Sequence, residues 1–365
     1  LHRMLLCNFS SLLRKVSDVI IFDQRGTGYS KPFLTCPDIS ERFDEAYFDE
    51  LLDIQDINRT QYETLDDLPL KFQEVIQEHF ALSQQICFEE SRSKGIDLHE
   101  FNTKNSAKDV DEIRKVFGFE TWSVLGVSYG THLALTYADS FSKHISSMIL
   151  DSVLPSDINF FADTMTNQKE SMEAFFEVCK TDRTCNDIYP DLEEDYLFIS
   201  RYLNNYPITS NVKDSDGDNV VLTGSDIAKI LWMFLYSSEN REYLPLYITY
   251  LAYDIYDDNI DTELIDDLAS IYEEEDEYSS DVMYFSIICQ DFFPDINLIE
   301  QRTLELGEYK DSFGSSSKLY TEAICTPWKN SESQITHNYH SEVPTLILSG
   351  ALDPITPTSW AKKVD

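Results

Sequence analysis

Residues 122–138, WSVLGVSYGTHLALTYA, decide the fold of this chain. A short apolar run at 122–125 meets the segment GVSYG, and a pattern typical of a helix follows at once. The motif Gly-x-Ser-x-Gly is specific here, because the strand, sharp turn and helix that give it meaning are all predicted around it. The stretch therefore predicts a parallel sheet whose carboxyl edge carries an exposed serine.

Ser128 is the predicted nucleophile of this turn. Glycines on both sides allow the backbone a strained, sharp bend that pushes the serine hydroxyl outward. The helix that follows has its positive end at the turn, so the Tyr129 N–H is placed where an oxyanion forms. An ordinary serine in a strand-to-helix turn is the alternative, and the motif in its context favours the nucleophile.

The apolar runs of the chain predict an α/β architecture. DVIIF at 18–22, the strand at 122–126 and SSMILDSV at 146–153 alternate with helical patterns. This order is typical of a mostly parallel sheet with helices on both faces. VPTLILSG at 343–350 returns as one more buried strand.

A long helix-rich, aromatic and acidic block interrupts the sheet. We expect a core at 1–155, an inserted helical cap at 156–342, and the resumed core at 343–365. The sequence begins at LHRMLL and stops at SWAKKVD, each within a predicted element, so we also expect segments to be missing at both ends.

Two aspartates compete for the acid of a catalytic triad. In this architecture the acid follows a later strand and the base follows the acid. Asp353 comes just after the resumed strand, in a turn rich in glycine and proline, while Asp151 comes after the apolar run MIL at 148–150 and so also follows a strand. We favour Asp353 and interpret Asp151 as a structural turn residue.

No histidine of the chain is a good candidate for the base. The seven are His2, His79, His99, His132, His144, His337 and His340. His337 and His340 precede Asp353, and His132 lies one helical turn after Ser128 and is interpreted as a helix-face residue. We therefore expect the catalytic histidine beyond Asp365.

The amino-acid composition argues against some classes of binding partner. Hydrophobic residues make up 42% of the 365, which predicts a globular protein, and no apolar run approaches the length that crosses a bilayer. With 66 Asp+Glu against 28 Lys+Arg the formal net charge is −38, which argues against nucleic acid or an anionic membrane as partner. Between Arg241 and Arg302 there is no Lys or Arg. This run predicts a solvated helical face, or alternatively a field that attracts positively charged peptide ends.

Seven cysteines give no metal signature. None forms a Cys-x-x-Cys pair and no Cys/His group has zinc spacing, so we expect no metal site. CKTDRTC at 179–185 is compact enough for a small disulfide loop, but free core thiols are equally compatible with the residues. QRGTGYS at 24–30 lacks the third glycine of a dinucleotide fingerprint, and we expect no cofactor.

Four motifs, DQRGTGYSKP, GVSYGT, LDSVLP and GALDPITP, resemble those of α/β-hydrolases of the proline iminopeptidase and tripeptidyl aminopeptidase type. The chain is most similar to the secreted bacterial tripeptidyl-aminopeptidase-like branch, over nearly all of its length. The resemblance implies an α/β-hydrolase fold with a helical cap, and release of short peptides or single residues from a free amino terminus. It assigns the nucleophile to Ser128, the acid to Asp353 and one oxyanion donor to the Tyr129 N–H. It also implies that the Asp23–Gly26 loop lies against the serine turn.

The same resemblance implies further residues. It suggests the disulfides Cys36–Cys87, Cys179–Cys185 and Cys289–Cys325, which leave Cys7 unpaired and favour a secreted or periplasmic location. Asp291, in CQDFF, is the implied partner of the substrate ammonium. The segment that supplies the second oxyanion donor is expected before Leu1.

Three functions remain in competition. The leading prediction is a serine exopeptidase acting on peptides with a free amino terminus. The alternatives are a small-molecule carboxylesterase on the same fold, because specificity is set outside the fold itself, and a non-catalytic peptide-binding relative. Without a catalytic histidine the given chain is expected to be a poor catalyst.

Overall fold

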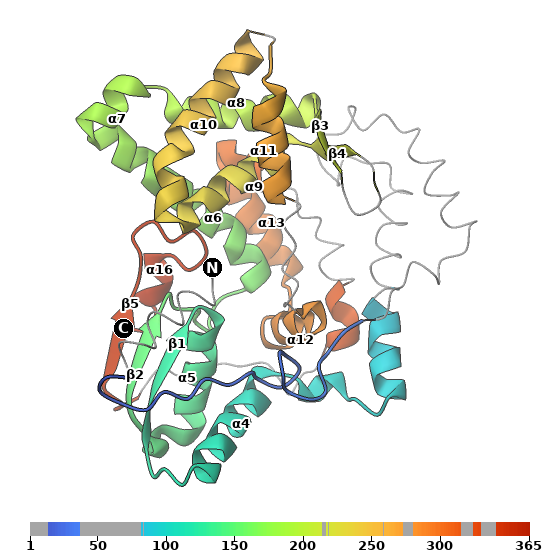
Figure 1. The fold of residues 1–365 in the computed structure, drawn as a ribbon, viewed down its shortest axis with the longest axis vertical. Coiled ribbons are helices and arrows are strands. Elements are labelled where there is room, and N and C mark those ends of the chain that lie inside the picture. The colour runs from blue at the N-terminus through green and yellow to red at the C-terminus, as the bar shows by residue number, and fades with distance from the viewer. Residues whose placement is uncertain are drawn as a thin grey trace.

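The computed structural model describes residues 14–36, 82, 84–213, 217, 219–257, 259–272, 280–314, 324–329 and 341–365. Within these ranges a small α/β core and a mainly helical cap are stacked along the long axis of the molecule (Figure 1). None of the described helices is both long and apolar enough to cross a membrane.

The core is built on a parallel sheet. It has the order β1-β2-β5, formed by β1 (Trp122–Val127), β2 (Ile145–Asp151) and β5 (Thr345–Leu348). β1 pairs with β2 through registers such as Leu125 with Ile149, and β2 pairs with β5, which comes from the far end of the chain. The strands predicted at 122–126, 146–153 and 343–350 are thereby confirmed.

Helices cover one face of this sheet. α4 (Thr103–Val116) and α5 (Tyr129–Phe141) pack against each other, and the short turn η5 (Ser142–His144) leads from α5 into β2. Tyr137 and Ala138 of α5 lie buried with Met148 of β2. Farther along α5, Ala134 and Leu135 meet Leu150 of β2 and Ala361 of α16 (Thr358–Ala361).

Among the described residues, no helix covers the opposite face of the sheet. Pairing places Leu125 beside Ile149 and Leu346, and Val127 beside Asp151 and Leu348, so these side chains share one face. Leu125, Val127, Leu346 and Leu348 are 38%, 46%, 53% and 42% exposed. In the part of the chain that the structure describes, helices therefore cover one face rather than the expected two.

The strand predicted at 18–22 was wrong. The structure assigns no strand to these residues, and Ile21 is exposed. A β-branched apolar run becomes a strand only where a neighbour completes its backbone hydrogen bonds, and β1 is paired with β2 alone among the described strands. The apolar content of residues 18–22 therefore suggested a strand, although no described strand lies beside them to pair with.

The cap is mainly helical, as expected. Its elements are α6 (Phe160–Thr181), α7 (Arg183–Ile188), α8 (Leu192–Asn205), α9 (Gly224–Met233), η6 (Phe234–Tyr236), α10 (Ser238–Tyr256), α11 (Thr262–Tyr272), α13 (Ile296–Glu305), η7 (Gly307–Tyr309) and α14 (Lys310–Phe313). They share one large cluster of buried side chains, which includes Tyr196, Leu231 and Phe313. The cap also contains an antiparallel ribbon, β3 (Ile208–Lys213) with β4 (Asn219–Leu222), which the sequence reading missed.

One helix from the second half of the chain packs on the core side. α12 (Asp281–Asp291) contacts η4 (Leu98–Glu100) and η8 (Thr326–Trp328). Its buried face shares a cluster with Leu34, Cys87 and Phe101, from the first part of the chain. In Figure 1 α12 accordingly lies beside the core, although it falls inside the range 156–342 expected for the cap.

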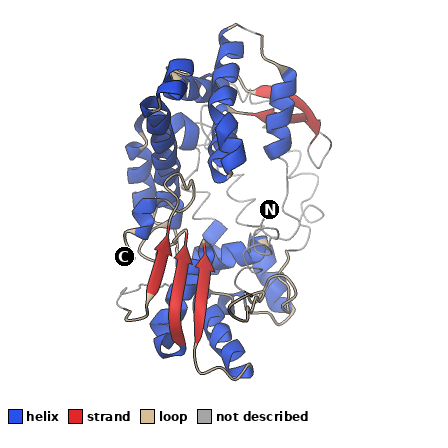
Figure 2. Ribbon diagram, turned by 60° about the vertical axis from the view of Figure 1, so that its left-hand side comes forward, coloured by secondary structure: helices blue, strands red, loops and turns tan. Residues whose placement is uncertain are grey.

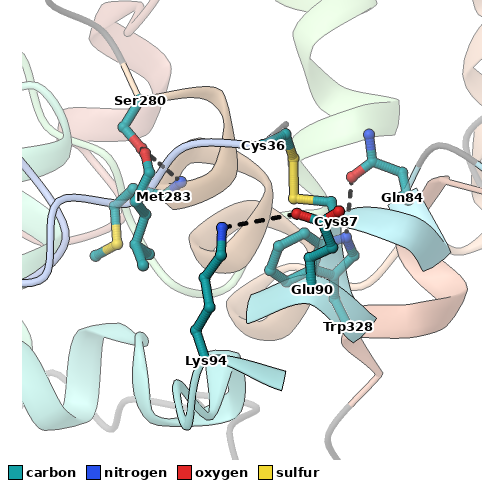
Figure 3. Close-up of a disulfide and its surroundings, with 9 residues drawn as sticks. Cys36, Gln84, Cys87, Glu90, Lys94, Ser280, Met283 and Trp328 are labelled. Atoms are coloured by element: carbon teal, nitrogen blue, oxygen red, sulfur yellow. Dashed lines mark hydrogen bonds and ion pairs between the residues drawn. A yellow bond between two sulfur atoms is a disulfide. The ribbon is translucent and has the colours of Figure 1, made fainter. Parts of the chain in front are cut away.

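Three disulfides are formed, between the pairs Cys36–Cys87, Cys179–Cys185 and Cys289–Cys325. Figure 3 shows Cys36–Cys87 above an ion pair of Lys94 with Glu90 and beside Trp328, whose indole N–H donates to Gln84 at 3.3 Å. Cys289–Cys325 joins α12 to the residue before η8. Two of the three bonds thus fasten the α12 region, while Cys7 lies outside the described residues.

Candidate active site

Ser128 lies in the turn between β1 and α5 with φ 53° and ψ −123°. This backbone region strains any residue that carries a side chain. The Ser128 N–H donates to the Asp151 carbonyl at 3.0 Å, and its own carbonyl accepts from the Thr131 N–H at 2.9 Å and the Thr131 hydroxyl at 2.7 Å. These bonds hold the strained residue in place, which is the geometry of a nucleophile elbow.

Gly126 brings the helix close to the strand. A Cβ at this position would lie 2.3 Å from the Gly130 carbonyl oxygen, a distance that real structures do not tolerate. A Cβ at Gly130 would meet nothing within 4 Å. Close packing therefore requires the first glycine of the motif, whereas the described contacts leave room at the second.

Tyr129 is the first residue of α5, so its N–H lies at the positive end of that helix. Its hydroxyl makes a 2.8 Å hydrogen bond with the Thr103 hydroxyl of α4. Burial raises the pKa of the Tyr129 phenol well above its usual range, and the charge of Asp291 raises it further. The side chain therefore stays neutral and anchors the start of α5, which steadies the backbone N–H beside the serine.

Asp353 lies in the turn that follows β5. Its Oδ1 accepts the N–H groups of Ile355 and Thr356 at 2.9 Å each, and its Oδ2 accepts the Thr356 hydroxyl at 2.9 Å. The turn closes with the Asp353 N–H donating to the Gly350 carbonyl at 3.2 Å. The carboxylate is thus fixed in one orientation by its own loop.

The sheet brings the predicted nucleophile and acid to one edge. β1, β2 and β5 run parallel (Figure 2), so Ser128 and Asp353 follow the carboxyl ends of β1 and β5, and Asp151 is the last residue of β2. In that view the strands point toward the cap. Asp151 contributes its backbone carbonyl to the serine turn, and its side chain accepts a 3.4 Å hydrogen bond from Ser152.

The cap reaches the turn of Asp353. The Asn167 side chain of α6 donates to the Ile355 carbonyl at 3.2 Å, and Leu352 and Ile355 pack against the buried cluster of the cap. Burial raises the pKa of Tyr236 in η6, and the negative charge of Asp353 raises it further. Cap and core therefore meet at the candidate acid.

The described histidines each face a carboxylate. His144 Nδ1 lies 2.7 Å from Asp111, and His99 Nδ1 lies 3.5 Å from Asp97. His132 Nε2 lies 3.6 Å from an oxygen of Asp291. His2, His79, His337 and His340 lie outside the described residues.

The sequence reading missed the pairing of His132 with Asp291. Both side chains are buried completely, and the ring of Phe292 packs 4.8 Å from that of His132. Asp291 ends α12, while His132 lies one turn into α5, so the pair links the helix behind the serine to a helix from far along the chain. No local sequence signal connects these two residues, and only the close packing of α12 beside the core reveals the contact.

The Asp23–Gly26 loop is held through its arginine. Arg25 makes two 2.7 Å hydrogen bonds to the Asp109 carboxylate on α4 and a third to the Glu100 carbonyl. A bidentate pair of this kind fixes both partners in one geometry. The loop is thereby tied to α4, the helix that packs on α5.

Comparisons with known proteins agree with this geometry. A family model described as alpha/beta hydrolase fold matches residues 6–279, and one described as TAP-like protein matches residues 311–365.

Three curated relatives are similar to parts of the chain. Tripeptidyl aminopeptidase of Streptomyces lividans is 32% identical over 140 residues, 38% of this chain and 22% of that protein. "Putative hydrolase YuaR" of Escherichia coli is 23% identical over 96% of this chain and 65% of that protein. Serine protease Hip1 of Mycobacterium tuberculosis is 33% identical over 21% of this chain and 15% of that protein. The chain thus spans less than two thirds of the length of each of these relatives.

Proposed function

The chain belongs to the α/β-hydrolase fold family, within its tripeptidyl-aminopeptidase-like type, and on that premise we propose that it is a serine exopeptidase. It removes short peptides or single residues from free amino termini through an acyl-enzyme. The observation that carries the proposal is Ser128, held at a positive φ between β1 and α5, on the same sheet edge as the turn of Asp353. Relatives named tripeptidyl aminopeptidase and serine protease support a peptidase.

In this mechanism the Ser128 hydroxyl oxygen attacks the carbonyl carbon of the substrate while its proton passes to a histidine. The Tyr129 N–H stabilises the negative charge that develops on the carbonyl oxygen. The histidine then protonates the departing amine, and a water molecule releases the acyl group by the reverse sequence. Asp353 orients that histidine and stabilises its charged form.

The general base in our proposal is a histidine that follows Asp365 in the natural protein. In the triad order of this fold the base comes after the acid. His99 and His144 face carboxylates on or near α4, and His132 faces Asp291 inside the protein. Replacing each histidine downstream of Asp353 in the full-length enzyme tests this assignment.

Asp291 is our candidate for the partner of the substrate ammonium. It is buried near Tyr129, the residue that follows the nucleophile, and neither of its oxygens accepts a hydrogen bond from another described residue. A buried carboxylate without hydrogen bonds is costly and is stabilised by a cation. In our proposal the incoming ammonium meets that need.

We assign selection of the substrate to a cap at 156–342, which covers a core at 1–155 and 343–365. The contacts of α6 and η6 with the turn of Asp353 support this division. We also propose an extracytoplasmic location, since three disulfides persist most readily in an oxidising compartment.

The first test compares two substrates of the full-length protein. A tripeptide anilide with a free amino terminus is expected to be hydrolysed far faster than its N-acetylated twin, with Ser128→Ala as the inactive control. Equal rates on both, or hydrolysis of simple esters alone, would contradict the exopeptidase and favour the carboxylesterase. Binding of peptides without any turnover would favour the non-catalytic relative.

A further inference from the structure

An open groove of about 760 Å³ lies in the cap between α10 and α11. This volume is within the range of binding sites for sizeable ligands. Both helices belong to the cap (Figure 1), and residues of both line the groove together with residues 259–261, which precede α11. None of the residues assigned to the reaction lies in it.

One wall of the groove is aromatic. Tyr243, Tyr247 and Tyr250 follow each other at the spacing of one helix face of α10 and all line the groove. Tyr247 is anchored in the cap by an edge contact with Phe234, with ring centroids 5.2 Å apart. Tyr243 and Tyr250 are each 57% exposed, so their rings present flat surfaces to solvent.

The other wall and the rim are acidic. Asp254, Asp261, Glu263 and Asp267 line the groove, and no Lys or Arg is among its lining residues. Asp254 accepts the Asp261 N–H at 3.1 Å, and Asp261 accepts the Glu263 N–H at 2.9 Å, so the loop that carries these carboxylates is held in shape. Uncompensated carboxylates in one concave site create a negative potential that attracts cations.

The carboxylates are too spread out for a single ion. Among the described residues no group of three or more His, Cys, Asp or Glu side chains is arranged to hold a metal. A second copy of the chain is also a poor occupant, because each copy carries a formal net charge of −38. The wall of tyrosines, by contrast, suits side chains that combine an apolar stem with a cationic head, since lysine and arginine bind well over aromatic rings.

We propose that this groove is an exosite for a basic segment of the polypeptide substrate, with Lys or Arg side chains over the tyrosines and facing the carboxylates. The inference rests on the proposed exopeptidase function. α10 begins two residues after Tyr236, which lies near Asp353, so the groove extends away from the candidate acid along this helix.

The distance from the candidate acid to the groove indicates which part of the substrate can reach the groove. Tyr243 lies five residues after Ser238, the first residue of α10, roughly 8 Å along that helix. An extended chain covers this in about three residues. In an exopeptidase only a few residues precede the cleaved bond, and they stay close to the catalytic site. The part of the substrate that reaches the groove is therefore the chain that follows the cleaved bond.

The test uses the full-length protein and fluorescent peptides that share their first residues and differ in the tail, one rich in Lys and the other in Glu. Equilibrium binding is measured with a Ser128→Ala background, so that turnover does not interfere. The Lys-tailed peptide is expected to bind more tightly, with a difference that shrinks as salt rises. Tyr250→Ala and Asp267→Asn are each expected to weaken its binding about threefold to fivefold.

Two other tyrosines of α10 supply matched controls. Tyr253 and Tyr256 are 60% and 64% exposed but do not line the groove, so Tyr253→Ala and Tyr256→Ala are expected to leave binding unchanged. Equal affinity for both tails, or equal losses in the control variants, would overturn the exosite. In the active enzyme the groove variants should raise KM for the Lys-tailed peptide and leave kcat unchanged.

The two proposals fail separately. If the Lys-tailed peptide binds through the groove but its amino terminus is never cleaved, the exosite holds and the exopeptidase is wrong. If free amino termini are cleaved with no preference for the tail and no effect of the groove variants, the exopeptidase holds and the exosite is wrong.

Discussion

At Ser128 the backbone holds a conformation that costs on the order of 1–3 kcal/mol in a residue with a side chain. The cost is sustained because neighbours fix the residue from both sides: the Asp151 carbonyl accepts its N–H, and Thr131 bonds its carbonyl twice. In the proposed mechanism this turn presents the Ser128 hydroxyl to the substrate carbonyl. The turn therefore keeps a conformation that lowers the stability of the protein.

Relieving the strain should therefore stabilise the protein. Ser128→Gly is expected to unfold with a free energy about 1 kcal/mol higher than Ser128→Ala, because glycine adopts a positive φ without a Cβ clash. Both variants lack the hydroxyl and should be inactive, so the pair isolates the backbone effect. Urea denaturation of the two proteins measures the difference. An alanine variant as stable as the glycine variant would mean that the turn carries no strain.

Local sequence predicted Ser128 and Asp353 because each is defined by what precedes it in the chain, a strand and a turn. The pairing of His132 with Asp291 had no such signal, since it depends on how α12 packs beside α5. His132 was expected to be an ordinary helix-face residue, which a 3.6-residue period cannot distinguish from a buried ionic partner. The roles proposed for Ser128, Asp353, Tyr129 and Asp291 remain predictions.

Among the elements, α4 is fastened to the core by one buried carboxylate. Asp111 accepts from Arg114 at 2.9 Å and from Lys115 at 2.9 Å on its own helix, while His144 Nδ1 lies 2.7 Å away. Burial alone would raise the pKa of Asp111, but the hydrogen bonds from these three side chains outweigh it and hold the pKa well below its usual range. The ionised form is therefore strongly favoured in the folded protein.

Because the folded pKa of Asp111 is lowered, the protein should become less stable as pH falls. The folded pKa of Asp111 is lower than the unfolded value of about 3.9, so its contribution is complete above roughly pH 5 and is lost as pH falls. Asp111→Asn should lower the free energy of unfolding by about 3–5 kcal/mol at pH 7. The difference in free energy of unfolding between this variant and the wild type should become smaller below about pH 4. Denaturation curves across this range provide the measurement.

An exposed carboxylate on the same helix serves as the control. Glu112 pairs with Lys115 at 2.8 Å but is largely exposed, so Glu112→Gln should cost no more than about 0.5 kcal/mol. Similar losses of stability in Asp111→Asn and Glu112→Gln would show that burial does not explain how strongly Asp111 stabilises the protein.

Strand prediction succeeded where an apolar run also had a partner strand beside it. β1, β2 and β5 were found because each apolar run also has a partner strand, whereas 18–22 has the composition of a strand without a described neighbour. The ribbon of β3 and β4 was missed because both strands are short: β3 (ITSNVK) is mostly polar, and β4 (NVVL) has only four residues. Its register is set by tertiary contacts, including Asn211 with Asp266 on α11, which sequence does not display.

Across the whole molecule, the disulfides close loops of very different length. The disulfide Cys36–Cys87 closes a sequence separation of 51 residues, and Cys179–Cys185 closes one of 6. Both belong to regions that pack against buried clusters, the first beside α12 and the second at the end of α6. The fold class was predictable from the order of strands and helices, but the side on which α12 packs was not.

Removing these two bonds should have unequal effects. Loop-closure entropy of the unfolded chain gives a stabilisation of about 4 kcal/mol for Cys36–Cys87 and about 2 kcal/mol for Cys179–Cys185. The double serine variants of each pair, compared by chemical denaturation under oxidising conditions, should show this order. A larger loss from the six-residue loop would mean that native packing, rather than chain entropy, dominates.

The sheet face that no described helix covers has a colloidal consequence. Leu125, Val127, Leu346 and Leu348 form a short-range adhesive surface, while the formal charge of −38 supplies a longer-range repulsion between molecules. Salt shortens the reach of that repulsion to about 8 Å at physiological ionic strength and leaves apolar adhesion intact. Solutions of the chain should therefore stay clear in dilute buffer and become turbid as salt is added, the reverse of ordinary salting-in.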